Sequence, residues 1–232
     1  MNLTELEQEI IECRQCPRLV EWREEVARVK RKAFIDADYW GKPVPGFGDP
    51  NAKVMVVGLA PGAHGSNRTG RQFTGDGSGN FLFPALYRAG FASQAESVAR
   101  GDGLTLSEMF ITASGRCAPP QNKPSPDELN TCQPFLEREI ELIQPKVFVA
   151  LGRIAFERIL RIYNLPKKEY AFGHGALHKL PNGKWLLASY HPSRQNTQTG
   201  CLTVEMFDEI WQKAQELIKK YYTQSSQRFT KF

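Results

Sequence analysis

The sequence predicts an α/β fold: a three-layer α/β/α sandwich around a central, mainly parallel four-stranded sheet. The first observation is an alternation of short apolar runs with helical patterns, which is typical of parallel strands buried on both faces. The four runs span residues 53–59, 108–113, 147–151 and 185–190. The second is the length of 232 residues, which suits one core, so a single domain is expected at residues 1–222. Residues 223–232 are expected to form a flexible C-terminal tail.

The helices before the first strand are marked by a cap and by apolar spacing. Asn2 and Glu5 form a capping-box pattern, and apolar residues then recur at helical spacing up to Cys13. A second helix is expected at about 21–32. Residues 41–50 are too rich in proline and glycine for regular structure, so they are expected to form a loop.

The later elements carry local signals of the same kind. Ser125 and Glu128 form a second capping box with a proline in the first helical position, although Pro134 should kink or split this helix. The Asn-Gly pair at 182–183 predicts a tight hairpin, so the last strand should have an antiparallel neighbour. The final helix, at about 204–222, carries its apolar residues on one face, which should pack against the sheet.

Composition and charge narrow the class of protein. A hydrophobic fraction of 41% and a charged fraction of 24% are those of an ordinary globular protein. Thirty basic against 25 acidic residues give a net charge of +5, which suits a phosphate backbone without requiring one. No apolar run approaches the roughly 18 residues of a membrane span, and the acidic N-terminus lacks a secretory signal pattern. The protein is therefore expected inside the cell and away from the membrane.

Four of the five cysteines form two groups, a Cys-x2-Cys pair near the N-terminus and two more much later in the chain. Because disulfides are disfavoured inside the cell, this pattern favours a tetrathiolate metal site over four unrelated core cysteines. Zinc and a [4Fe-4S] cluster both accept four thiolates, and the spacing does not separate them. With no open coordination position, the metal should be structural and should anchor the N-terminal segment through Cys13, Cys16, Cys117 and Cys132.

Two loops are expected to meet at the carboxyl edge of the sheet, where open α/β sheets bind their ligands. A glycine-rich polar turn that leads to Asp76 follows the first strand, and His191 follows the last strand. Taken singly, His191 is more simply a turn histidine bonded to backbone, and Asp76 a solvated carboxylate or a helix N-cap. Together with Asn122 they furnish a base-sized crevice with imidazole, carboxylate and amide groups, which favours a catalytic pocket.

These motifs resemble those of the uracil-DNA glycosylase superfamily, which has a GxxPG-type turn after the first strand and a His-Pro-Ser/Ala-type loop after the last. Gly58-Leu59-Ala60-Pro61-Gly62 and His191-Pro192-Ser193 occupy these places. The four cysteines narrow the likeness to the iron–sulfur branches. The run GLAPGAHGSNRTGR together with HPSxxN is similar to the fifth family, the type-B glycosylases. The resemblance runs from about Cys13 to Tyr222.

The resemblance implies an enzyme that hydrolyses the N-glycosidic bond of uracil in DNA and so begins base excision repair. It implies a [4Fe-4S] cluster on the four cysteines and a single- or double-stranded DNA substrate with one base turned out into the pocket. His191 is expected to hydrogen-bond the base carbonyl on which negative charge develops, and Asp76 to face the sugar or orient water. Where most of the superfamily has Asp, Asn or Glu, this chain has Ala60, as the fifth family does, so the usual water-activating group is absent.

Other residues are expected to hold the base or the DNA. Phe73 is expected to stack on the turned-out base and Asn122 to pair with its polar edge, with core packing and turn formation as the simpler roles. Base contacts are also expected from the backbone of the first motif, at Gly58, Ala60, Gly62 and Ala63. Asn196 is expected to enter the duplex or grip flanking phosphates. The candidates for phosphate contact, or for solvated surface charge, are Arg68, Arg71 and Arg194.

Gly62 stands where uracil-specific relatives have a bulky aromatic residue, so a lower pocket wall is expected. Such a wall would admit hypoxanthine, xanthine or 5-hydroxymethyluracil. Two rival classes stay open: a non-catalytic iron–sulfur nucleic-acid-binding module, and a zinc hydrolase built on the histidines, which lack an HxxH or HExxH unit. DNA is the expected partner, a sliding clamp stays a candidate, and the chain is expected to be a monomer. It should reside in the cytoplasm, on the nucleoid when bound to DNA.

Overall fold

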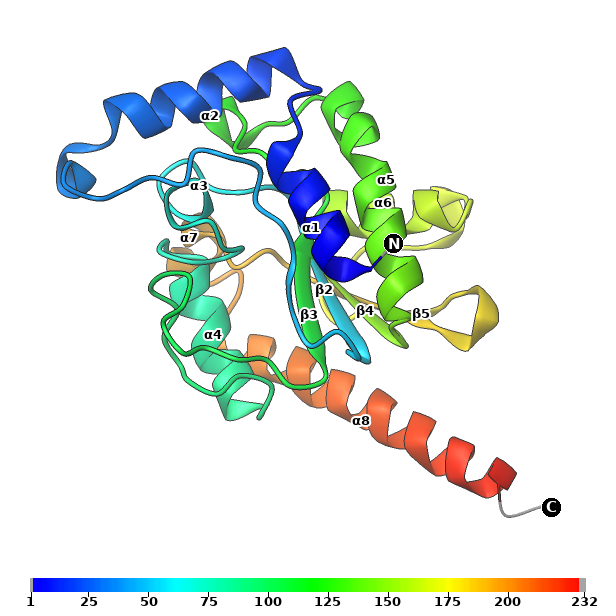
Figure 1. Ribbon diagram of the computed structural model, residues 1–232. Coiled ribbons are helices and arrows are strands. Elements are labelled where there is room, and N and C mark those ends of the chain that lie inside the picture. Colours follow the sequence, from blue (N-terminus) through cyan, green and yellow to red (C-terminus); the bar gives the residue numbers. More distant parts are fainter. Residues whose placement is uncertain (1, 230–232) are drawn as a thin grey trace.

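The described part of the chain folds around a six-stranded mixed sheet (Figure 1). The computed structural model describes residues 2–229, with side chains up to Thr223. The strand order is β1-β3-β2-β4-β6-β5. The four central strands run parallel and are β2 Val54–Gly58, β3 Met109–Ala113, β4 Val147–Leu151 and β6 Trp185–Ser189. Each lies within one of the four predicted runs, because burial on both faces leaves a nearly unbroken apolar pattern.

The expected count of four strands is wrong, because an antiparallel strand borders the sheet at each edge. β1 (Phe47–Gly48) pairs with β3, and β5 (Leu177–Lys179) pairs with β6. The predicted antiparallel neighbour of the last strand is confirmed, but the turn is Pro181–Gly183 instead of the two residues Asn182 and Gly183, whose φ values are 61° and 74°. β1 escapes prediction because two residues inside a Pro/Gly-rich loop carry no alternation.

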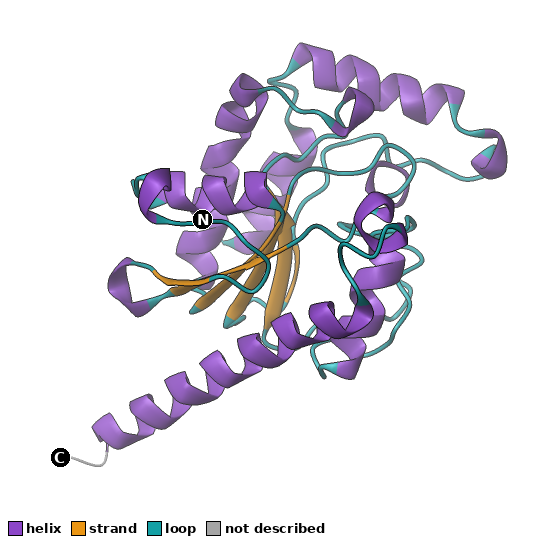
Figure 2. Ribbon diagram, turned by 180° about the vertical axis from the view of Figure 1, so that it is seen from behind, coloured by secondary structure: helices purple, strands orange, loops and turns teal. Residues whose placement is uncertain are grey.

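Helices cover both faces of the sheet, which confirms the predicted three layers (Figure 2). One face packs against α4 (Gly79–Arg88) and α8 (Val204–Phe229), the other against α5 (Pro126–Ile143) and α6 (Arg153–Ile162). The other helices described are α1 Leu3–Glu12, α2 Pro17–Val29, α3 Ser66–Thr69 and α7 Arg194–Gln198. Short 3-10 turns lie at Lys32–Phe34, Pro120–Asn122, Lys167–Glu169 and Pro181–Gly183.

The helix ends follow the local caps more closely than the apolar spacing. Both capping boxes are present: Asn2 accepts from the Glu5 amide at 3.0 Å, and Ser125 from the Glu128 amide at 3.2 Å. α2 begins earlier than the expected 21, directly after Cys16, because a proline occupies its first position. α5 runs through Pro134 as one helix, so the expected split is wrong, and after this residue Leu136, Ile140 and Ile143 pack in the core on that face of the sheet.

The last helix buries its predicted face against the sheet through Phe207, Trp211, Ala214 and Ile218. It continues to Phe229, so residues 223–229 are helical instead of frayed, while 230–232 of the expected tail lie outside the described residues. Its C-terminal half projects beyond the body of the molecule in Figures 1 and 2. Among the described residues, none of the helices combines the length and apolarity that crossing a membrane requires.

Candidate active site

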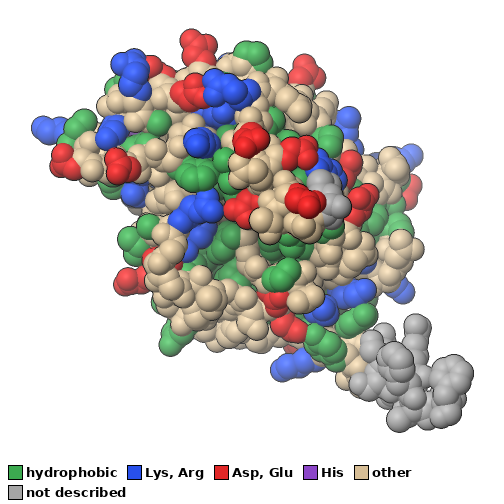
Figure 3. All heavy atoms as spheres, in the orientation of Figure 1, with side chains coloured by type: hydrophobic (Ala, Val, Ile, Leu, Met, Phe, Trp, Pro, Cys, Tyr) green, Lys and Arg blue, Asp and Glu red, His purple; other side chains and the backbone are tan. Residues whose placement is uncertain are grey.

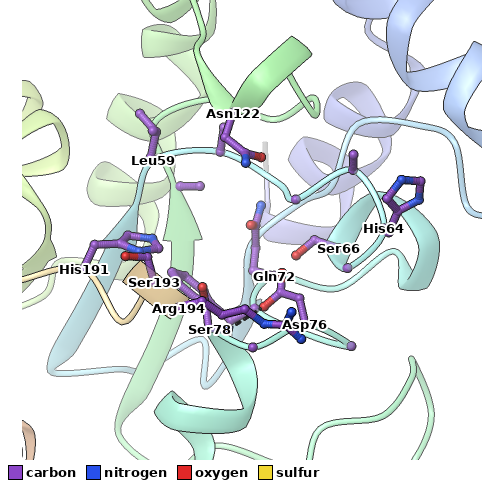
Figure 4. Close-up of a pocket in the computed structure, with 18 of the residues that line it drawn as sticks. Leu59, His64, Ser66, Gln72, Asp76, Ser78, Asn122, His191, Ser193 and Arg194 are labelled. Atoms are coloured by element: carbon purple, nitrogen blue, oxygen red, sulfur yellow. Dashed lines mark hydrogen bonds between the residues drawn. The ribbon is translucent and has the colours of Figure 1, made fainter. Parts of the chain in front are cut away.

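A pocket of about 680 Å³ opens at the carboxyl ends of the central strands (Figure 4). It takes residues from the turn after β2, the loop before α4, the 3-10 turn after β3 and the loop after β6. His191 and Asp76 both line it, as predicted. The pocket also contains the predicted Ala60, Gly62, Ala63, Phe73 and Asn122. This volume is ample for one nucleoside and falls in the usual range for small-molecule sites.

Asp76 lies just before α4, whose N-cap is Ser78, and it forms a wall of the pocket. Its Oδ1 atom accepts hydrogen bonds from the amides of Ser78 at 2.9 Å and Gly79 at 3.1 Å, where α4 begins. Its Oδ2 atom lies against the first motif, so that a Cβ on Gly65 would stand 2.2 Å from it and one on Gly62 2.9 Å. Burial raises the pKa of Asp76, against the lowering effect of the two amides and of nearby arginines. Asp76 is therefore not the N-cap itself, but it accepts from the amides at the start of α4 and also lines the pocket.

This arrangement corrects the predicted role of Gly62. A side chain at this position would point at the Asp76 carboxylate instead of closing over the base. Gly62 is thus required by the close approach of the acid, and the expectation of a lower pocket wall does not follow from it.

His191 lies on the opposite side of the pocket, after the end of β6 (Figure 4). Its ring nitrogens bond to none of the described residues, so it is not the backbone-bonded turn histidine of the simpler interpretation. Burial lowers the pKa of His191 to about 4, so the imidazole is uncharged near neutral pH. An uncharged imidazole donates one N–H, which can bond an oxygen that gains negative charge.

Phe73 forms the floor between these two groups. Its ring centroid lies 5.9 Å from that of His191, and only 7% of the residue is exposed. It has φ 52°, a left-handed conformation that is costly for an aromatic residue and is found mostly at functional sites. Gly58, expected to contact the base, does not line the pocket; a Cβ there would stand 2.7 Å from Cζ of Phe73. Gly58 therefore makes room for the aromatic floor.

The two predicted amides take different positions. Asn122 is exposed at the mouth of the pocket, where it points inward in Figure 4. Asn196 does not line the pocket: its Nδ2 atom donates to the carbonyl of His191 at 2.8 Å. Asn196 thus holds the loop that carries the imidazole, and its contact with DNA stays a prediction.

The arginines proposed for phosphate contact are mostly structural. Arg68 donates to the carbonyls of His64 and Gly75 at 2.9 and 3.2 Å, and Arg71 is buried in an ion pair with Asp102 at 2.6 Å. Arg194 is exposed at the pocket, so it remains a candidate for contact with a DNA phosphate. Figure 3 shows basic and acidic side chains interspersed over the face in view.

The pocket residues that were not assigned a role from the sequence include Arg31, Ser66 and Gln72. Arg31 comes from the segment after α2, which the sequence does not connect with the sheet edge. Ser66 and Gln72 are 2% and 1% exposed, and both belong to the long polar turn after β2. Their position in that turn was the available signal, but polar residues are common in loops.

The four histidines do not gather around one point, which argues against the zinc-hydrolase hypothesis. His174 and His178 bond through Nε2 to the carbonyls of Met206 and Ala171, away from the pocket. His64 lines the pocket, but its Nδ1 atom is 2.9 Å from the hydroxyl of Tyr39. Of the four, only His191 has ring nitrogens that form no hydrogen bond with the described residues.

The four predicted cysteine ligands lie near one another, between the α1–α2 corner and the start of α5. Cys117 and Cys132 are buried and the N-terminal pair is half-buried, whereas Cys201 is exposed. Burial raises the pKa of Cys16 to about 11 and that of Cys117 to about 12, and the neighbouring thiols add to both effects. These mutual effects reflect how close the thiols lie to one another.

Buried arginines surround these thiols. Arg23, 1% exposed, donates to Sγ of Cys117 at 2.9 Å, and its Nε atom is left without a partner. Arg158 is buried too; it bonds to the amide of Asn130 at 2.8 Å, and one terminal nitrogen has no partner. Buried positive charge of this kind fits an anionic group held by thiolates. Among residues 2–229, however, no three His, Cys, Asp or Glu side chains stand as ligands of one metal ion.

The fold and the pocket define a class of protein: an α/β protein with an imidazole and a carboxylate on facing walls of a base-sized pocket at the carboxyl edge of its sheet. Residues 45–215 match the model of the family described as "Uracil DNA glycosylase superfamily". The chain belongs to this family.

Curated relatives cover nearly the whole chain. A type-5 uracil-DNA glycosylase of Thermus thermophilus is 56% identical over 90% of this chain and 95% of its own length. A type-5 uracil-DNA glycosylase of Pyrobaculum aerophilum is 45% identical over 88% of both chains. A type-4 uracil-DNA glycosylase of Archaeoglobus fulgidus is 30% identical over 65% of this chain and 70% of its own length.

Proposed function

We propose that the chain is a uracil-DNA glycosylase that hydrolyses the N-glycosidic bond of uracil in DNA. Relatives named for this activity are 45% to 56% identical to it over most of its length. The observation that carries the proposal is the pocket in which an uncharged His191 faces a half-buried Asp76 (Figure 4). DNA is then the partner, and repair of deaminated bases is the role.

The two side chains suit opposite ends of the breaking bond. As the C1′–N1 bond lengthens, negative charge gathers on the carbonyl oxygen of the base and positive charge on the sugar. The uncharged imidazole of His191 donates to that oxygen, and burial strengthens the bond because little water competes. Asp76, when ionised, steadies the sugar cation and accepts a proton from the attacking water.

The base reaches this pocket only after leaving the duplex, because a stacked base exposes neither its sugar nor its edge to an enzyme. Phe73 offers a rigid aromatic floor on which the base can stack. Asn122, at the mouth, offers an amide with both a donor and an acceptor for the base edge. Because the pocket of about 680 Å³ exceeds a pyrimidine, hypoxanthine, xanthine and 5-hydroxymethyluracil belong among the proposed substrates.

The proposal includes a [4Fe-4S] cluster on Cys13, Cys16, Cys117 and Cys132, as in the iron–sulfur, type-B glycosylases that the sequence resembles. Its support is the set of four thiols and the buried Arg23 and Arg158 beside them. Each thiolate of such a cluster binds a different iron, so the thiols stand farther apart than the ligands of one ion. When bound, the cluster supplies a cross-link between the N-terminal segment and α5, with no open position for substrate.

A glycosylase assay tests the proposal. The purified chain is incubated with duplexes that contain uracil, hypoxanthine or xanthine, and free base is measured together with the abasic product. We expect release of uracil by the wild type and a loss of about 100-fold or more in His191→Ala, as is typical when an oxyanion donor is removed. Binding of the duplex without release of base would support a binding module instead.

A further inference from the structure

The proposed hydrolysis leaves one group unassigned, the one that fixes the attacking water. Ala60 offers only a methyl group where most of the superfamily has a polar side chain. Asp76 can take a proton, but a single oxygen does not orient a water molecule. A water molecule in the pocket needs further polar atoms that the protein itself leaves without a partner.

Two buried side chains meet this condition. Ser66 is 2% exposed and Gln72 1%, yet both line the pocket. Gln72 is fixed by its Nε2 atom, which donates to the carbonyl of Val44 at 2.9 Å, so its Oε1 atom remains as an acceptor. Neither this Oε1 atom nor the Ser66 hydroxyl bonds to any of the described residues. Both oxygens are therefore open to the pocket, where a bound water or ligand can take the place of a protein partner.

The same atoms lie on the side of the pocket that Asp76 occupies. Figure 4 shows the hydroxyl of Ser66 pointing into the pocket between the amide of Gln72 and the carboxylate of Asp76. Ser66 follows Gly65, whose bare Cα lets Oδ2 of Asp76 approach the turn. His191 and the space for the base lie across the pocket from this group.

We infer that Ser66 and Gln72 are positioning residues that hold the attacking water against Asp76. This inference rests on the proposed glycosylase function. The water donates one hydrogen to Oδ2 of Asp76 and the other to Oε1 of Gln72, and it accepts from the hydroxyl of Ser66. Three of its four hydrogen-bonding positions are then used, and the remaining lone pair is free for C1′.

The reaction balances with these groups. The water oxygen bonds to C1′ as the C1′–N1 bond breaks, and the bonding pair leaves with the uracil anion. One proton of the water passes to Asp76 and then to solvent, while the uracil anion takes up a proton. No further reactant is required.

The test measures which nucleophile is used as well as the rate. Uracil-containing DNA is treated with excess enzyme in water and in a water–methanol mixture, and mass spectrometry separates the free abasic sugar from its methyl glycoside. In Ser66→Ala we expect a single-turnover rate about 5-fold lower, the effect of one lost hydrogen bond, with binding of an uncleavable uracil analogue within about 2-fold of wild type. The ratio of methyl glycoside to free abasic sugar should rise by about 3-fold or more. The Ser66 hydroxyl holds water better than it holds methanol, so its loss slows attack by water more.

Gln72→Met is the second variant, since it keeps the volume and removes the Oε1 acceptor. The matched control is Ser114→Ala, which deletes an equally buried hydroxyl that bonds to the Gly58 carbonyl at 3.0 Å. We expect the ratio to rise in Gln72→Met and to stay at the wild-type value in the control. An unchanged ratio in both Ser66→Ala and Gln72→Met overturns the inference, even if their rates fall. If the wild type releases no base, the proposed function fails instead.

Discussion

Replacing Gly65 with alanine tests whether the position of the Asp76 carboxylate governs the chemistry. The added Cβ would stand 2.2 Å from Oδ2, 2.7 Å from Cγ and 2.8 Å from Cβ of Asp76. Non-bonded heavy atoms settle at about 3.5 Å or more, so the carboxylate has to move by about 1 Å.

A displacement of this size has a calculable cost. Misplacing a catalytic group by about 1 Å lowers a rate by about 100-fold, and that is the loss expected for the single-turnover release of uracil. The shift also weakens the bonds from Oδ1 to the amides of Ser78 and Gly79. Loss of this cap and the crowding together should lower the free energy of unfolding by about 2–3 kcal/mol.

The rates are measured with excess enzyme on a uracil-containing duplex, and stability by denaturant unfolding. Gly173→Ala is the matched control, because a Cβ there meets no atom within 4 Å, and it should behave as wild type. The double variant Gly65→Ala/Asp76→Ala should be no slower than Asp76→Ala alone, since both changes act through one group. A rate for Gly65→Ala within about 3-fold of wild type would refute the reasoning, as would additive losses in the double variant.

Three other outcomes follow from the site. Because the pKa of Asp76 is raised and the ionised form is the active one, single-turnover rates should fall as the pH drops through that pKa and level off above it; this acid limb should be absent in the residual activity of Asp76→Asn. Arg31→Ala should weaken DNA binding and reduce the slope of log affinity against log salt by about 1, and an unchanged slope would remove Arg31 from the interface. Cys117→Ser should lower the iron bound per chain and the temperature of unfolding together, whereas Cys201→Ser should change neither; equal iron content in both variants would contradict the proposed ligand set.

The sequence predicts those parts of the fold that depend on neighbours in the chain. The central strands are visible because burial on both faces makes each an apolar run, and the capping boxes because their partners are three residues apart. β1 is missed since its two residues pair with a strand about 60 positions later, at Phe110 and Ile111. At Pro134 the sequence allows a kink or a split, and the structure excludes the split.

The candidate site follows the same division. His191 and Asp76 could be brought together from the sequence because the carboxyl ends of parallel strands share one edge of a sheet. The roles of Asn196 and Arg71 could not be predicted, because each is decided by a specific partner: the carbonyl of His191 in one case and Asp102 in the other. A polar side chain in a loop has the same appearance in the sequence whether it faces substrate or its own backbone.

Because the Asp76 carboxylate both lines the pocket and bonds to the start of α4, its position depends on how α4 packs against α8. Oδ1 accepts hydrogen bonds from the amides at the start of α4, so the position of Oδ2 is restricted by that helix. α4 packs against α8, and Arg88 of α4 forms an ion pair with Asp208 of α8 at 2.7 Å. Substitutions that weaken the contact between α4 and α8 should therefore lower the rate of base release, although none of the substituted residues lines the pocket.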